Sequence, residues 1–180
     1  MNTPAPQSTP WWTQLGALRW TSLAALVILL DQLTKSLIAA KIHLFEVVPL
    51  LPFLELTQLH NEGAAFSVFA NASGWQRWFF VGLAAVVSIA ILLWMRQIDP
   101  RRQRALAAGF ALILGGAIGN MIDRLLHGHV IDFIHFHWKG GDFPAFNVAD
   151  SAISVGAGLL ILDALLESRR ARLARREPST

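Results

Sequence analysis

The chain alternates between four long apolar stretches and shorter segments that are richer in polar residues. The apolar stretches cover residues 20–40, 78–95, 105–125 and 148–166. A helix needs about 20 predominantly apolar residues to cross the hydrocarbon core of a bilayer. The pattern therefore predicts an integral membrane protein that is mainly α-helical, with four transmembrane helices in a single membrane domain.

The segment between the first two spans, residues 41–74, is too long and too polar to be a simple turn. Pro49 and Pro52 prevent a continuous helix, and the residues from Leu54 to Thr57 alternate between apolar and polar as a short strand does. We expect a small, partly β extramembrane platform here, resting on the bilayer surface.

The composition agrees with this pattern, because 54% of the 180 residues are hydrophobic and only 15% are charged. Soluble domains average about 25% charged residues. The chain contains no Cys, which excludes disulfides, thiolate metal ligands and a cysteine nucleophile. Its arginines flank apolar spans without any nucleic-acid-binding motif, so we expect membrane lipids as partners and no nucleic acid.

Arginines are concentrated in two places, and their positions predict the topology. Four lie within residues 96–104 and five lie in a tail, residues 167–180. The platform and a second predicted loop outside the membrane, residues 126–147, hold fewer basic residues. Because segments rich in Lys and Arg stay in the cytoplasm, we expect both termini to be cytoplasmic and the platform and second loop to lie outside.

Residues that a membrane helix rarely tolerates gather on one side of this topology. An ionisable group near the bilayer centre costs about 2.5–3.5 kcal/mol on insertion scales, so such groups commonly mark functional sites. Here they occupy the outer halves of two spans, the outer segments and the first turn of the fourth span, which predicts one site at the outer bilayer surface. They are Asp31, Lys35, Asn61, Glu62, Asn120, Asp123, Arg124, Asp132 and Asp150.

Asp31 and Lys35 are four residues apart with the acid first, which is the favourable order for an ion pair along a helix. Such an internal pair would lower the cost of insertion without any direct role in a site. Asp123 could pair in the same way with Lys35 or Arg124. The sequence leaves both the structural and the functional interpretation open.

The outer acids Asp123, Asp132 and Asp150 indicate carboxylate chemistry. Two carboxylates in one site cannot both ionise cheaply, so the pair keeps one proton and offers a base for water and an acid for a leaving amine. A structural role is equally open for Asp150, since Asn147 can cap the fourth helix and Asp150 can complement its dipole. The spacing does not decide which two acids form the pair.

Three alternatives were weighed against this hypothesis. The four histidines of residues 126–147 could bind a metal, but no HExxH spacing occurs. A Ser–Lys dyad could use Lys35 with Ser36, Ser67 or Ser151, but there is no GxSxG motif. A small proton-coupled transporter would need polar residues that continue into the inner leaflet, where the spans hold few. We therefore expect neither a metal nor another cofactor.

Five short motifs, taken together and in order, resemble those of the lipoprotein signal peptidases (signal peptidase II). Each alone is weak, but the five with four spans at matching places are specific, and the resemblance covers nearly all of the chain except the N-terminal leader and the arginine tail. The motifs are DQLTK at 31–35, NEGAAFS at 61–67, GNMIDR at 119–124, VIDF at 130–133 and FNVADS at 146–151.

The resemblance implies an aspartic endopeptidase of the bacterial plasma (inner) membrane that needs no cofactor and acts as a monomer. Its partners would be diacylglyceryl-modified prolipoproteins, whose signal peptides are cut off just before the lipid-modified cysteine at the outer leaflet. The resemblance makes Asp132 and Asp150 the catalytic pair. The residues that would shape the site or bind substrate are Asp31, Lys35, Asn61, Asn120, Asp123, Arg124 and Asn147.

Overall fold

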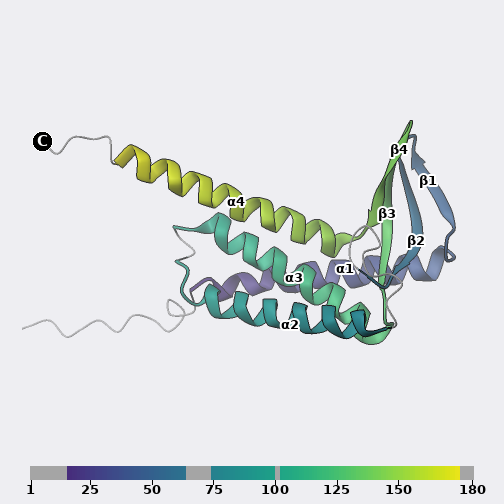
Figure 1. The fold of residues 1–180 in the computed structure, drawn as a ribbon, viewed down its shortest axis with the longest axis horizontal. Helices are drawn as coiled ribbons and strands as arrows, with labels where there is room; N and C mark the ends of the chain where they lie inside the picture. The colour runs from purple at the N-terminus through teal and green to yellow at the C-terminus, as the bar shows by residue number, and fades with distance from the viewer. Residues whose placement is uncertain (1–15, 64–73, 100–101, 175–180) are drawn as a thin grey trace, which may run out of the picture.

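The computed structural model describes residues 16–63, 74–99 and 102–174, which form a helical bundle and one small sheet (Figure 1). The motif NEGAAFS and the arginine tail each extend beyond these described residues. The helices are η2 (Gly16–Trp20, a 3-10 turn), α1 (Thr21–Lys41), α2 (Trp75–Met95), α3 (Arg104–Leu126) and α4 (Val148–Ala174). The strands are β1 (Val47–Leu51), β2 (Leu54–Asn61), β3 (Val130–Trp138) and β4 (Gly141–Phe146).

The four long helices α1 to α4 are each long and apolar enough to cross a membrane. Large apolar side chains point away from the bundle along their length, and Leu29, Val86 and Ile161 are each about 60% exposed or more (63%, 66% and 62%). Soluble proteins rarely expose apolar surface on this scale. The structure thus confirms the predicted fold, a mainly α-helical membrane protein with a small partly β platform after the first helix.

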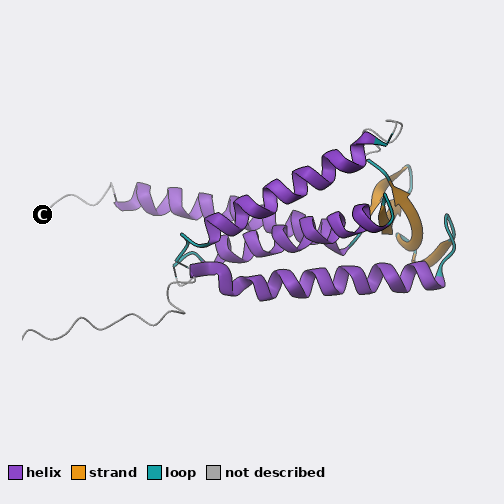
Figure 2. Cartoon of the chain, turned by 90° about the horizontal axis from the view of Figure 1, so that it is seen from below, coloured by secondary structure: helices purple, strands orange, loops and turns teal. Residues whose placement is uncertain are grey.

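The sheet lies at one end of the bundle, as two perpendicular views show (Figures 1 and 2). Helices α1 and α3 end there, and α2 and α4 begin there. The end of α2, the beginning of α3 and the end of α4 lie at the opposite end of the bundle. The fold therefore separates the polar motifs, near the sheet, from the arginine-rich ends of the helices.

The sheet is antiparallel throughout, with the strand order β1-β2-β3-β4. Strands β1 and β2 come from the predicted platform, but β3 and β4 come from residues 126–147, for which a loop was predicted. That prediction is wrong. In β3 the polar His135 and His137 alternate with Phe136 and Trp138, which is the period of a strand. Gly140, with a φ of 98°, then closes a tight hairpin into β4.

Glycines on α3 allow α1 and α4 to pack closely against it. A Cβ atom at Gly115 would lie 2.7 Å from the Cβ atom of Val27 on α1, and one at Gly116 would collide with the carbonyl oxygen of Ala149 on α4. At Gly119 it would lie 2.7 Å from Oδ2 of Asp31. Small residues at helix interfaces permit such approaches in membranes, and here they bring the polar groups of three helices together.

Candidate functional site

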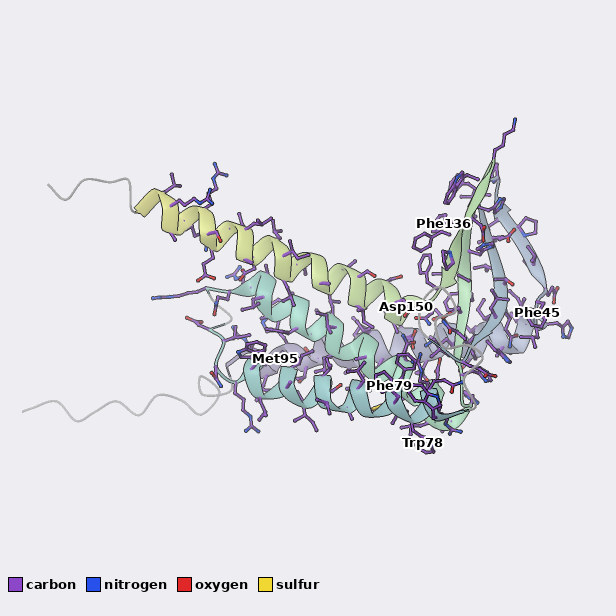
Figure 3. All side chains as sticks on the ribbon, viewed as in Figure 1. Phe45, Trp78, Phe79, Met95, Phe136 and Asp150 are labelled. Carbon is purple, nitrogen blue, oxygen red and sulfur yellow. The ribbon has the colours of Figure 1, made fainter. Side chains whose placement is uncertain are left out.

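The predicted site residues converge where the sheet meets the bundle, close to the start of α4 where Asp150 lies (Figure 3). One continuous network of hydrogen bonds and ion pairs joins them. Glu62 is the exception, because it is exposed and lies outside that network. The joined residues are Asp31, Lys35, Asn61, Asn120, Asp123, Arg124, Asp132, Asn147 and Asp150.

A buried ion triad forms the base of the network. The ammonium of Lys35 lies 2.7 Å from Oδ2 of Asp31, which is the ion pair predicted from the sequence, and 2.8 Å from Oδ2 of Asp123. All three side chains are at most 3% exposed. Lys35 also donates a hydrogen bond to Oδ1 of Asn120 at 2.9 Å. The triad thus stabilises the polar helices internally and also holds a residue that reaches the aspartates above it.

The remaining carboxylate oxygens of the triad accept hydrogen bonds from other elements. Oδ1 of Asp31 accepts one from the backbone N–H of Ala149 at 2.9 Å, which ties α1 to the first turn of α4. Oδ1 of Asp123 accepts one from Nε2 of Gln32 at 2.8 Å. Sequence reasoning missed Gln32, although it lies inside the DQLTK motif as a polar residue in an apolar span. Its role depends on how closely α1 and α3 pack.

Asp132 lies on β3, is 4% exposed, and is held by two asparagines. Its Oδ2 accepts a hydrogen bond from Nδ2 of Asn61 at 3.0 Å, and its Oδ1 accepts one from Nδ2 of Asn147 at 2.8 Å. Burial, followed by the negative charge of Asp150, raises the pKa of Asp132 to about 7, against the opposing effect of the two asparagines and Lys35. Asp132 is therefore suited to hold a proton near neutral pH.

Asp150 is half-buried in the first turn of α4, where it forms a reciprocal cap with Asn147. Its backbone N–H donates to Oδ1 of Asn147 at 2.9 Å, and its Oδ2 accepts from the backbone N–H of Asn147 at 3.2 Å. Its Oδ1 accepts a hydrogen bond from Nδ2 of Asn120 at 2.8 Å. The predicted helix cap is present, and because Asn147 also binds Asp132, the same cap positions both aspartates.

Arg124 supplies positive charge beside the two aspartates. Its guanidinium lies 4.8 Å above the ring of Phe80, and its Nη2 donates to the carbonyl oxygen of Gly63 at 2.8 Å. Asp150 and Asp132 are the acids that interact with it most strongly. Its buried Nε has no hydrogen-bond acceptor among the residues that the structure describes. Arg124 thus offers a cation and a free donor next to the aspartate pair.

The other sequence alternatives are not assembled at this site. His135 contacts Glu55 on the sheet, with Nδ1 and Oε1 2.6 Å apart, and the ring of His129 stacks on His60 with centroids 3.7 Å apart. Within the described ranges, no group of three or more His, Cys, Asp or Glu is arranged as metal ligands. Ser151 donates to the carbonyl oxygen of Asn147 rather than contacting Lys35, and Ser67 lies outside the described residues.

Comparisons with known proteins point to one family. The sequence profile described as "Signal peptidase (SPase) II" matches residues 23–166. The lipoprotein signal peptidase of Shewanella woodyi is 49% identical over 154 residues, 86% of each chain. That of Alteromonas mediterranea is 51% identical over 146 residues, 81% of this chain and 80% of the relative. A bacterial membrane enzyme solved at 2.3 Å superposes with a TM-score of 0.75 at 32% identity, covering 90% of this chain and 93% of the other.

Proposed function

Because the chain belongs to the signal peptidase II family, we propose that Asp132 and Asp150 are the catalytic pair of an aspartic endopeptidase. The family fixes the class of reaction, since lipoprotein signal peptidases remove the signal peptides of prolipoproteins. This overturns the alternative of a small proton-coupled transporter. The aspartic mechanism, the residues and the side of the membrane are our proposal.

One observation carries the proposal: the single side chain of Asn147 contacts both aspartates. Its Nδ2 donates to Asp132 at 2.8 Å, and its Oδ1 accepts the backbone N–H of Asp150 at 2.9 Å. Asn61 and Asn120 each hold a further carboxylate oxygen. These contacts fix two acids in one site by neutral donors, which is the arrangement that favours one shared proton.

The raised pKa of Asp132, about 7, makes it the member that holds the shared proton. Asp150, the less buried acid, then acts as the base. Its carboxylate takes a proton from water as the water oxygen attacks the scissile carbonyl, and the carbonyl oxygen becomes a tetrahedral oxyanion. Collapse of this intermediate breaks the C–N bond, and an aspartic acid of the pair donates a proton to the leaving amine. The pair ends with one proton, as it began.

Arg124 lies where it could stabilise the oxyanion. Its guanidinium is held by Phe80 and by the carbonyl oxygen of Gly63, so it is oriented before substrate binds. Its buried Nε remains free to donate to a substrate carbonyl oxygen. Donors that are fixed in advance around a developing negative charge are commonly the largest single contribution to catalysis.

We further propose that the substrates are diacylglyceryl-modified prolipoproteins in the bacterial plasma membrane, cut before the lipid-modified cysteine. The arginine-rich helix ends lie away from the sheet, which by the positive-inside rule favours cytoplasmic termini and a site on the outer side. An acyl-bearing cysteine would rest at the depth where lipid tails enter the bilayer. Asp132 and Asp150 lie at that end of the bundle.

The test is cleavage of a lipidated precursor by purified Asp132→Asn and Asp150→Asn proteins. We expect each to lose at least about 100-fold in kcat/KM, the lower range for removing a general acid or base. The matched control is Asp163→Asn, which alters a carboxylate on the same helix as Asp150 but three turns farther from the sheet. Cleavage at the control rate by either active-site variant would overturn the assignment.

A further inference from the structure

The outer half of the sheet has two unlike faces. Successive side chains of a strand point to opposite faces, so Phe136 and Trp138 of β3 share one face while His135 takes the other. On the first face the rings of Phe53 and Phe136 stack at 6.4 Å, and those of Phe136 and Phe146 at 6.0 Å. With Phe143, Trp138 and, at its edge, His137, these rings line an open groove of about 500 Å³, which we call the aromatic groove.

The opposite face of the same strands is charged. Nδ1 of His135 lies 2.6 Å from Oε1 of Glu55, and its Nε2 lies 3.4 Å from Oδ2 of Asp142. Nε2 of His137 lies 3.5 Å from the other carboxylate oxygen of Glu55. Ionisable groups are stable at a surface in contact with water. One face of the outer sheet is therefore suited to water, and the other is suited to an apolar phase.

The aromatic groove opens toward the membrane-spanning part of the molecule. Figure 3 shows Phe136 on the side of β3 that is turned toward α4 and Asp150, not on the side that faces away from the helices. Phe53, Trp138 and Phe143 remain 51%, 58% and 49% exposed. The groove is thus accessible from the space below the sheet, beside the first turns of α4.

We propose that the aromatic groove is a membrane-contact surface, occupied by acyl chains of the phospholipids that surround the helices. The exposed apolar surface of α4, which includes Val155, continues the groove toward the bilayer. Phe and Trp rings are enriched where protein meets the interface of a bilayer. Lys139, exposed in the hairpin next to Trp138, can reach the headgroups while its stem stays among the rings.

Lipid in the groove would give the sheet a fixed height above the bilayer centre. Asp132 lies on β3 only four residues before Phe136, about 13 Å along an extended strand. A contact between Phe136 and the lipid would therefore also set the depth of the Asp132 carboxylate. This inference concerns a lipid surface and does not depend on which residues catalyse.

The chain has no Cys, so single cysteines can be labelled with a nitroxide without removing others. Phe143→Cys places the label in the aromatic groove, and Asp142→Cys places a matched control on the adjacent residue of β4, which faces the charged side. Both proteins are reconstituted into vesicles of phosphatidylethanolamine and phosphatidylglycerol, with a water-soluble nickel chelate on both sides. Cleavage of precursor by each labelled protein verifies the fold, and Phe53→Cys provides a second groove position.

We expect the label at position 143 to collide readily with oxygen and several-fold less with the nickel chelate than the label at 142. Equal accessibility of the two positions to the chelate would overturn the proposal. So would a label at 143 that the chelate reaches freely until a non-cleavable lipidated precursor is added, since the occupant would then be substrate. Dipolar broadening between labels that grows with protein density would equally overturn it, because a second copy would fill the groove.

Discussion

The hydrogen bond from Asn61 to Asp132 gives a quantitative test of the shared-proton mechanism. It joins Nδ2 of Asn61 to Oδ2 of Asp132 at 3.0 Å and favours the ionised carboxylate, so it lowers the pKa of Asp132 against the effect of burial. Replacing Asn61 by Leu removes this donor. The pKa of Asp132 should then rise above its value of about 7.

The size of the shift follows from the energy of the bond. A hydrogen bond to a charged group contributes about 1.5–3 kcal/mol, and one pKa unit corresponds to about 1.36 kcal/mol. The pair should therefore lose its shared proton about 1 to 2 pH units higher in Asn61→Leu than in the wild type. Because the protonated pair is the active form, activity should extend to higher pH, even if its maximum falls.

The assay is the pH profile of kcat/KM with a lipidated precursor in detergent micelles. The alkaline limb reports the apparent pKa of the pair rather than of one residue. Asn61→Asp keeps an acceptor for the backbone N–H of Gly63 and puts a negative charge beside Asp132, so its limb should move at least as far. Gln58→Leu is the control, since this buried amide on the same strand contacts His60. An alkaline limb that stays in place, or moves down, in active Asn61 variants would refute the reasoning.

Two further predictions concern the base of the site. Lys35→Met should lower the free energy of unfolding by about 3–5 kcal/mol, because it leaves two buried carboxylates without their cation; thermal unfolding in detergent measures this, and an unchanged Tm would contradict the role of the triad. Gly119→Ala should also lower Tm, since its Cβ would lie 2.7 Å from Oδ2 of Asp31, whereas Gly158→Ala meets nothing within 4 Å and should gain stability from helix propensity, by up to about 1 kcal/mol. Equal Tm changes in the two glycine variants would contradict the close approach of α1 and α3.

Local patterns were sufficient to predict the spans and the helix cap at Asn147. Hydropathy depends on composition within one segment, and a cap depends on residues three positions apart. A structural and a functional interpretation of Asn147 and Asp150 were weighed as alternatives, yet the structure unites them in one side chain. The Oδ1 of Asn147 caps α4 while its Nδ2 binds Asp132. An amide has two ends, and a sequence pattern describes only the end that acts locally.

Contacts between distant segments could not be predicted in the same way. Strand β3 pairs with β2, and Asn61 and Asp132 are 71 positions apart. The histidines of β3 were considered as metal ligands, although they form the polar half of a strand that alternates with Phe136 and Trp138. Gln32 carried no periodic signal, because its partner Asp123 is 91 positions away and reaches it through helix packing.

The choice between the acids depends on the kind of partner that each one has. Asp31 and Asp123 lie 2.7 Å and 2.8 Å from the ammonium of Lys35, so their charges are balanced inside the bundle. Asp132 and Asp150 instead accept hydrogen bonds from amides, and in the described part of the chain neither forms an ion pair within 4.0 Å. Neutral donors orient a carboxylate without cancelling its charge, so two such acids in one site favour keeping a proton between them. Spacing cannot distinguish these two kinds of acid, because the difference arises only when Lys35 of α1 lies against α3 and not against β3. The same argument supports Asp132 and Asp150 as the reacting pair and Asp123 as part of the base that supports them.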